Sequence, residues 1–202
     1  MNISKLAILV SLGTALSVKA DTTFTSESAF VAALPPGYYH NDFSTLTPFS
    51  GPLSSVTASG GTPLVSYQIT APSSGLFINN DSGFNAVGNY AQSQDVVLTF
   101  TSPGVRAVGA EFYLCNINGV NQNGTISLTF SDGTTGTAPS SATGPYGFFG
   151  VIANVDLTSM TIANNSAGFL NMANLTVQAV PEPSAGCLSL LCAILLLRSR
   201  KR

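Results

Sequence analysis

The side chains that usually carry enzyme chemistry are scarce in this sequence. Its only histidine is His40, so a catalytic triad or a zinc cluster built on histidine has almost nothing to work with. No CxxC, HExxH, GxSxG or phosphate-loop pattern occurs. We interpret His40 as a partly exposed strand or loop residue, and we expect no catalytic residue and no metal site.

Carboxylate pairs are the remaining route to catalysis, because two of them can hydrolyse a glycosidic bond without histidine. Residues 21–180 contain eight acidic residues, scattered about one to each expected strand or turn. Sequence brings no two of them together, so we expect that the chain is not an enzyme. Against these acids stands one cation, Arg106, and the formal charge of −7 disfavours nucleic acid and anionic lipid as partners. We expect Arg106 to pair with an acid at the rim of the fold.

Two further groups of residues could in principle bind a metal ion or react, but the sequence favours a structural role for each. The segment 79–83, Asn-Asn-Asp-Ser-Gly, offers oxygen atoms of the kind that calcium takes. It lacks the alternating acids and the distal glutamate of an EF-hand, and it is typical of an Asx-rich turn. Cys115 is the one cysteine of residues 21–180, so we expect no disulfide within that stretch. We interpret Cys115 as a small buried hydrophobe rather than a reactive or metal-bound thiol, and we expect no cofactor.

Tyrosine supplies the binding chemistry that the residue types favour most, because a flat ring with a polar tip suits the face of a sugar. The chain has six tyrosines and no tryptophan. The candidates for sugar stacking are Tyr38, Tyr39, Tyr67 and Tyr113. The alternative role, which the sequence favours, is packing between neighbouring strands at the edge of a β-sandwich.

The residues that position these groups form a mostly β pattern. After Phe43, turn-forming residues interrupt the chain every eight to twelve residues, as in a sandwich or barrel. We expect extended or strand segments at 38–43, 64–70, 76–79, 96–100, 108–114, 126–130, 147–152, 157–162 and 169–177. The segment 131–134, Ser-Asp-Gly-Thr, is typical of a hairpin turn, and a shift of the apolar phase between Met172 and Leu175 indicates a bulge. One helix is expected over 26–34.

Counting these segments gives about eight to ten strands. We predict an all-β fold, an antiparallel β-sandwich of the jelly-roll type, rather than a closed barrel. Besides the short early helix, the sequence predicts an N-terminal signal helix and a C-terminal hydrophobic helix.

Residues 1–20 have the pattern of a secretory signal peptide. Lys5 supplies the positive first region, and residues 6–18 form an apolar stretch too short for a membrane span of about 20 residues. Val18 and Ala20 place small residues at the two positions that matter for cleavage. We expect cleavage after Ala20.

The last 22 residues, 181–202, contain three parts in order. The tripeptide Pro181-Glu182-Pro183 is followed by thirteen uncharged residues, 185–197, and then by basic residues. The basic tail consists of Arg198, Arg200, Lys201 and Arg202. A thirteen-residue helix is about 20 Å long against a hydrocarbon core of about 30 Å, so it is a marginal membrane anchor. The basic tail favours the cytoplasmic side, which puts the preceding residues outside that membrane.

This tail resembles the PEP-CTERM sorting signal of exported bacterial proteins in its Pro-Glu-Pro element, its apolar helix and its arginine-rich end. The resemblance implies that an exosortase-type membrane transpeptidase recognises residues 181–202 and cuts near the Pro-Glu-Pro element. Pro181, Glu182 and Pro183 are then substrate residues of another enzyme. The resemblance also implies a bacterium that makes extracellular polysaccharide, and a destination at the cell surface or in the surrounding matrix.

The preceding residues more loosely resemble the small β-sandwich domains that often come before this signal. The matching stretches are 96–100 before Ser102-Pro103, 108–109 before an aromatic strand, 131–133, 148–151 and the closing strand. Such closing strands commonly carry an apolar-Asp-Asn-apolar motif, and carbohydrate-binding jelly rolls often hold a calcium ion near that place. Here Ala173 stands where the acid would be, which counts against a structural calcium ion.

We therefore divide the chain into a signal peptide (1–20), a β-sandwich domain (21–180) and a sorting signal (181–202). The favoured function is an exported, non-catalytic protein of the cell surface or extracellular matrix, held transiently in the membrane by its C-terminal helix. The alternative is a carbohydrate-binding module for exopolysaccharide. A glycan-acting enzyme is the third hypothesis, and it requires two carboxyl groups about 5–9 Å apart in a cleft.

Overall fold

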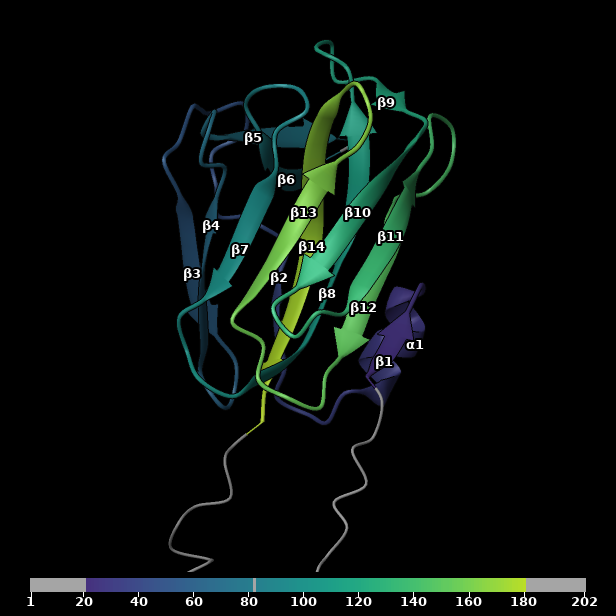
Figure 1. The fold of residues 1–202 in the computed structure, drawn as a ribbon. Helices are drawn as coiled ribbons and strands as arrows, with labels where there is room; N and C mark the ends of the chain where they lie inside the picture. The colour runs from purple at the N-terminus through teal and green to yellow at the C-terminus, as the bar shows by residue number, and fades with distance from the viewer. Residues whose placement is uncertain (1–20, 82, 181–202) are drawn as a thin grey trace, which may run out of the picture.

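The structure is a computed structural model, and it describes residues 21–81 and 83–180. These residues form two antiparallel β-sheets stacked face to face, with one short helix near the start (Figure 1). The eight-stranded sheet contains, in spatial order, β1 (Thr22–Phe24), β12 (Gly147–Ile152), β8 (Val105–Cys115), β14 (Phe169–Ala179), β6 (Phe84–Asn89) and β5 (Leu76–Asp81), with β2 (Tyr39–Asn41) beside β14 and β9 (Asn121–Gln122) beside β8. The six-stranded sheet contains β11 (Thr135–Ser140), β10 (Gly124–Phe130), β13 (Ser159–Asn164), β7 (Val96–Phe100), β4 (Val65–Thr70) and β3 (Val56–Gly60). The predicted antiparallel β-sandwich is confirmed.

Alternation of apolar and polar residues decides which side chains enter the space between the sheets. In β4, Val65, Tyr67 and Ile69 are buried while their neighbours reach the outer face. The inward residues of both sheets form one continuous core. Each fully buried Val, Leu, Ile or Phe in such a core contributes about 1.5–3 kcal/mol relative to the exposed state. The two longest strands, β8 and β14, pair at the centre of the eight-stranded sheet.

The helix α1 (Glu27–Ala33) covers part of the outer face of the eight-stranded sheet, and it confirms the early helix that the sequence predicts. Ser26 stands at the N-cap position, but its side chain makes no capping hydrogen bond. Phe30 is fully buried against the sheet. Its ring lies over Gly109 and Gly150, where an added Cβ would come within 2.8 and 2.9 Å of the ring. Glycine at these two positions therefore lets the helix approach the sheet.

The prediction of eight to ten strands is too low, since the described residues hold fourteen. The five strands that the pattern did not predict are β1, β3, β6, β9 and β11. Two local predictions are confirmed. The pairing of β14 with β8 shifts register between Ala173 and Thr176, and Asn174 has a φ of 49°, which is the expected bulge. The hairpin of β10 and β11 turns through Gly133, whose φ is 91°.

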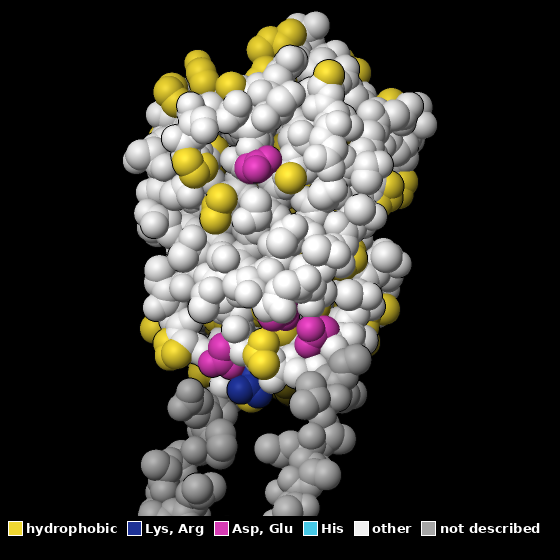
Figure 2. All heavy atoms as spheres, viewed as in Figure 1, with side chains coloured by type: hydrophobic (Ala, Val, Ile, Leu, Met, Phe, Trp, Pro, Cys, Tyr) yellow, Lys and Arg dark blue, Asp and Glu magenta, His cyan; other side chains and the backbone are white. Residues whose placement is uncertain are grey.

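The outer face of the six-stranded sheet is uncharged, because none of its six strands contains Asp, Glu, Lys, Arg or His. Serine and threonine occupy most outward positions; Thr135, Thr129 and Thr161, for example, lie side by side across three strands. In Figure 2 this face is mostly free of charged side chains, and several of those in view lie at its lower end. Arg106 and Asp156 form an ion pair of 2.8 Å with both side chains partly exposed, which confirms the pairing expected for Arg106.

The two ends of the described chain leave the sandwich at the same end (Figure 1). At one of them the N–H of Val180 donates to the carbonyl of Gly104 (2.8 Å). At the other, the Asp21 carboxylate accepts a hydrogen bond from the N–H of Asn154 (2.9 Å). The predicted signal peptide (1–20) and sorting signal (181–202) lie outside the described residues. Among the residues that are described, no helix has the length and apolar character needed to span a membrane.

Candidate functional site

The outer face of the eight-stranded sheet contains a pocket of about 490 Å³ at the end opposite the two chain ends. We call it the amide pocket. Its lining residues are Phe49, Phe77, Asn79, Asn89, Tyr90, Cys115, Asn116, Ile117, Asn118, Gly119, Phe169 and Asn171. The strand β14 shows the placement, because it begins at this pocket with Phe169 and ends at Ala179, next to the chain exit. The strands β5, β6 and β8 and the loop after β8 supply most of the other residues.

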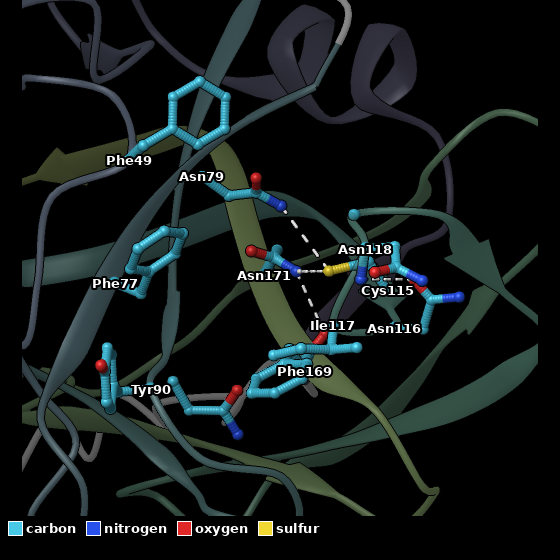
Figure 3. Close-up of a pocket in the computed structure, with 12 residues that line it drawn as sticks. Phe49, Phe77, Asn79, Tyr90, Cys115, Asn116, Ile117, Asn118, Phe169 and Asn171 are labelled. Atoms are coloured by element: carbon cyan, nitrogen blue, oxygen red, sulfur yellow. Dashed lines mark hydrogen bonds between the residues drawn. The ribbon is translucent and has the colours of Figure 1, made fainter.

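Aromatic rings form one side of the amide pocket (Figure 3). Phe77 projects from the outer face of β5, and its ring centre lies 6.2 Å from that of Tyr90. Phe49 stands at the mouth with 68% of its surface exposed. Its φ of 56° is in the left-handed region, which is unusual for a bulky residue. Two backbone hydrogen bonds tie this segment to β5, from Phe49 N to Ile78 O (2.7 Å) and from Ile78 N to Ser50 O (2.9 Å).

Two buried side-chain amides form the floor of the pocket, and both contact the sulfur of Cys115 (Figure 3). Asn79 Nδ2 lies 3.6 Å from the sulfur and 3.4 Å from the hydroxyl of Tyr113. Asn171 Nδ2 donates to the sulfur at 3.3 Å and to the carbonyl of Phe169 at 3.0 Å. The side chains of Asn79 in β5 and Asn171 in β14 therefore meet at the same sulfur atom, across the intervening strand β6.

Glycine in β6 makes room for one of these amides. A Cβ added to Gly88 would lie 2.7 Å from Asn171 Oδ1 and 2.2 Å from the carbonyl oxygen of Leu170. Only a residue without a side chain fits there. The close approach of β6 to β14 thus helps to place the Asn171 amide.

Cys115 contributes a neutral thiol to the pocket floor. It is 4% exposed, and burial raises the pKa of its thiol, so the thiol stays protonated at neutral pH. The predicted burial of Cys115 is confirmed, although it lies on the outer side of β8 and not in the main core. No residue that lines the amide pocket carries a charge. A charged ligand would therefore find no counter-ion there.

A second hollow, of about 430 Å³, lies on the same face and contains the acids Asp81 and Glu111. Asp81 Oδ2 accepts hydrogen bonds from Asn121 Nδ2 (3.0 Å) and from the hydroxyl of Tyr146 (2.7 Å). Glu111 Oε2 accepts one from Asn174 Nδ2 (2.6 Å). The hollow is therefore acidic, and neighbouring donors already occupy one oxygen of each carboxylate.

The stacked pair of Tyr113 and Tyr146 lies between these two hollows, with ring centres 4.4 Å apart and planes 19° apart. Tyr113 contacts Asn79 of the amide pocket, and Tyr146 donates to Asp81 of the acidic hollow. Burial raises the pKa of both phenols, and for Tyr146 the hydrogen bond to Asp81 acts in the same direction. Both hydroxyls therefore stay protonated. Within residues 21–81 and 83–180, no cluster of three or more His, Cys, Asp or Glu side chains could hold a metal ion.

The four tyrosines that the sequence proposes for sugar stacking do not lie together. Tyr67 is buried between the sheets and accepts a hydrogen bond from Asn41 Nδ2, while Tyr39 packs beside it at 6.2 Å between ring centres. Tyr113 is also buried, with 1% of its surface exposed. Tyr38 lines a small hollow beside α1. The structure therefore does not assemble the four tyrosines into one stacking platform.

His40 lies in the strand β2 and is exposed, in agreement with the sequence interpretation. Its Nδ1 lies 2.9 Å from the hydroxyl of Thr176. His40 lines the same small hollow as Tyr38, together with Glu27 of α1. The amide pocket does not include it.

Sequence reasoning missed most of the amide pocket, including the rings of Phe49, Phe77 and Phe169 and the amides of Asn79 and Asn171 as a binding pair. The available signal was an asparagine at a position with outward parity in the otherwise apolar run 169–173. Asn171 in β14 has this pattern. A scan against protein-family models finds no match for this chain, and a search of curated proteins finds none either.

Proposed function

We propose that this is an exported, non-catalytic protein of the cell surface or extracellular matrix, whose sandwich binds an uncharged carbohydrate in the amide pocket. The observation that carries the binding role is the composition of that pocket, in which aromatic rings stand beside buried amides and no lining residue is charged. Sugars present apolar C–H faces and hydroxyl groups together, and rings and amides complement these two surfaces. The ligand class is thus a neutral polysaccharide or oligosaccharide.

The export part of the proposal rests on the sequence of the two ends. Residues 1–20 serve as a signal peptide, and residues 181–202 serve as a PEP-CTERM sorting signal. The partners are an exosortase-type transpeptidase, the membrane that holds the C-terminal helix before processing, and exopolysaccharide. The negative charge of residues 21–180 favours a neutral polymer over nucleic acid. We also assign the sandwich to the jelly-roll type, as in the domains that its sequence resembles.

A glycan-acting enzyme is the less favoured alternative. Asp81 and Glu111 line one hollow, which is the kind of arrangement such an enzyme needs. However, Asp81 Oδ2 and Glu111 Oε2 already accept hydrogen bonds from neighbouring side chains. A substrate would have to displace these donors before either oxygen could act on it. Because neither acid lines the amide pocket, substitution of both by the corresponding amides should leave glycan binding unchanged.

The export proposal is tested in the native host by replacing Pro181, Glu182 and Pro183 with alanine. We expect the variant to stay in the membrane fraction with its C-terminal residues attached, whereas the unaltered protein reaches the surface without them. Intact-mass measurement distinguishes the two forms. A surface protein that still begins at Met1 and ends at Arg202 would contradict the proposal.

The binding proposal is tested with the full-length protein in mild detergent on an array of neutral and acidic glycans. We expect binding to neutral glycans, confirmed by calorimetry, and no binding to uronic-acid polymers. Absence of binding to every neutral glycan would refute the assignment of the amide pocket.

A further inference from the structure

The orientation of both amides on the pocket floor is fixed by the protein. The N–H of Asn80 donates to Asn79 Oδ1 (2.9 Å), so the Asn79 nitrogen faces the pocket floor. Asn171 Nδ2 donates to the carbonyl of Phe169, so its oxygen points the other way. Figure 3 shows this oxygen directed away from the sulfur of Cys115, toward the side of the pocket where Phe77 lies. The assignment of oxygen and nitrogen in both amides therefore follows from backbone contacts.

These orientations leave two groups available to a ligand, the acceptor Asn171 Oδ1 and the donor Asn79 Nδ2. Asn171 is 2% exposed, and its Oδ1 accepts no hydrogen bond from any other described residue. Asn79 is 8% exposed, and its Nδ2 has only long contacts, to the Tyr113 hydroxyl (3.4 Å) and to the sulfur of Cys115 (3.6 Å). A sulfur atom is a weak acceptor, so it satisfies a donor poorly. A ligand that donates to Asn171 Oδ1 supplies the partner that this acceptor lacks.

An acetamido group meets both the polar and the apolar requirements of this floor. In a trans amide the N–H and the methyl group lie on the same side of the C–N bond. An N–H that donates to Asn171 Oδ1 therefore brings the methyl group toward the ring of Phe77. A hydroxyl in place of the acetamido group makes the hydrogen bond but leaves the apolar wall uncovered. The Asn79 nitrogen remains available for a neighbouring sugar oxygen.

Charge and size restrict the ligand further. Free amino sugars and uronic acids are ionised at neutral pH, and the amide pocket has no residue of opposite charge for either. N-acetylation removes the charge of an amino sugar and adds the methyl group. The pocket volume of about 490 Å³ lies in the range of ordinary small-molecule sites, about 300–1,000 Å³. The pocket therefore suits a short stretch of a neutral glycan.

We propose that the amide pocket recognises the N-acetyl group of an amino sugar within a neutral glycan, with Asn171 Oδ1 accepting the acetamido N–H and Phe77 covering the methyl group. This inference rests on the proposed carbohydrate-binding function and specifies its ligand. Asn171 and Phe77 are thus the residues that set ligand specificity.

The test compares two ligands that differ only at this group, the β-1,4-linked trimers of N-acetylglucosamine and of glucose. Calorimetry on the full-length protein should give about fivefold to tenfold tighter binding of the acetylated trimer, because the hydroxyl of the glucose trimer keeps the hydrogen bond to Asn171 but lacks the methyl contact with Phe77. The array adds matched acetylated and hydroxylated pairs of galactose type. Preference for the acetylated member of either pair supports the inference.

The variant Asn171→Leu should reduce this preference to less than about threefold, while Asn165→Leu, at an exposed asparagine outside the pocket, should retain it. Thermal unfolding checks that each variant is folded. If Asn171→Leu does not fold, the comparison of the two ligands on the unaltered protein tests the inference. Equal affinity for both members of every pair overturns the inference and leaves the proposed function standing. Binding to no neutral glycan at all overturns both.

Discussion

Replacement of Phe49 by alanine should weaken glycan binding without weakening the fold. A phenylalanine side chain has about 200 Å² of surface to bury, and 68% of the surface of Phe49 is exposed at the mouth of the amide pocket. That leaves about 140 Å² for a ligand to cover. If a sugar covers half of it, the lost burial at about 25 cal/mol per Å² amounts to about 1.7 kcal/mol, or an affinity loss of about twentyfold.

The matched control is Leu64→Ala, since Leu64 is 64% exposed and does not line the pocket. Both variants should unfold within a few degrees of the unaltered protein, because surface substitutions change stability by about 0.5 kcal/mol or less. Calorimetric titration with the best neutral glycan from the array measures the affinities. Unchanged affinity in folded Phe49→Ala would refute the placement of the ligand beside this ring.

Three further predictions concern the fold itself. Phe30→Ala should destabilise the protein by about 3 kcal/mol or more in denaturant titrations, because it opens a cavity between α1 and the sheet; a loss below about 1 kcal/mol would contradict the close packing described for this ring. A double-mutant cycle on Arg106 and Asp156 should give a coupling below about 1 kcal/mol, because both side chains are partly exposed, and a larger value would show that the pair is shielded from water. Hydrogen bonds from Asn154 and Thr134 hold the pKa of Asp21 below its ordinary value. The stability that Asp21 adds is therefore fully present above the unfolded pKa of about 3.9 and is lost as the pH falls through the lower folded value. When the urea midpoint of unfolding is plotted against pH, the Asp21→Asn variant should lose less stability at acid pH than the unaltered protein.

The sequence predicted those parts of the fold in which one face of a strand is apolar and the other polar. The strands β7 and β10 alternate in this way, and Asp-Gly marks the turn after β10. The bulge in β14 was also visible, because an inserted residue shifts the apolar phase. These features depend on local pattern alone.

The strands β6 and β11 were missed because their sequences break that pattern. β6 contains two buried asparagines: Asn85 donates to the carbonyls of Phe43 and Leu46, and Asn89 donates to that of Gln94. Polar residues that satisfy loop carbonyls look like loop residues themselves when only the sequence is read. β11 contains Pro139, which a strand tolerates at the edge of a sheet, and β11 is an edge strand.

The amide pocket was out of reach for a different reason. Its aromatic and amide residues come from segments around residues 49, 77, 90, 117 and 170, and the pairing of β5, β6, β14 and β8 brings most of these segments together. The pocket also needs Gly88, whose lack of a side chain is a requirement of the neighbouring strand. Neither the contact between these distant segments nor the requirement for Gly88 can be predicted from a local sequence pattern.

The position of both chain ends, opposite the amide pocket, has a consequence for how the protein would stand on a cell. The strand β14 and the residue after it run from the pocket to the chain exit, which at about 3.3 Å per residue is a height of about 35 Å. A tether at either end would leave the ligand-binding mouth facing the medium, that far above the point of attachment. Neighbouring copies tethered in this way would present their binding pockets at the same height above the cell surface.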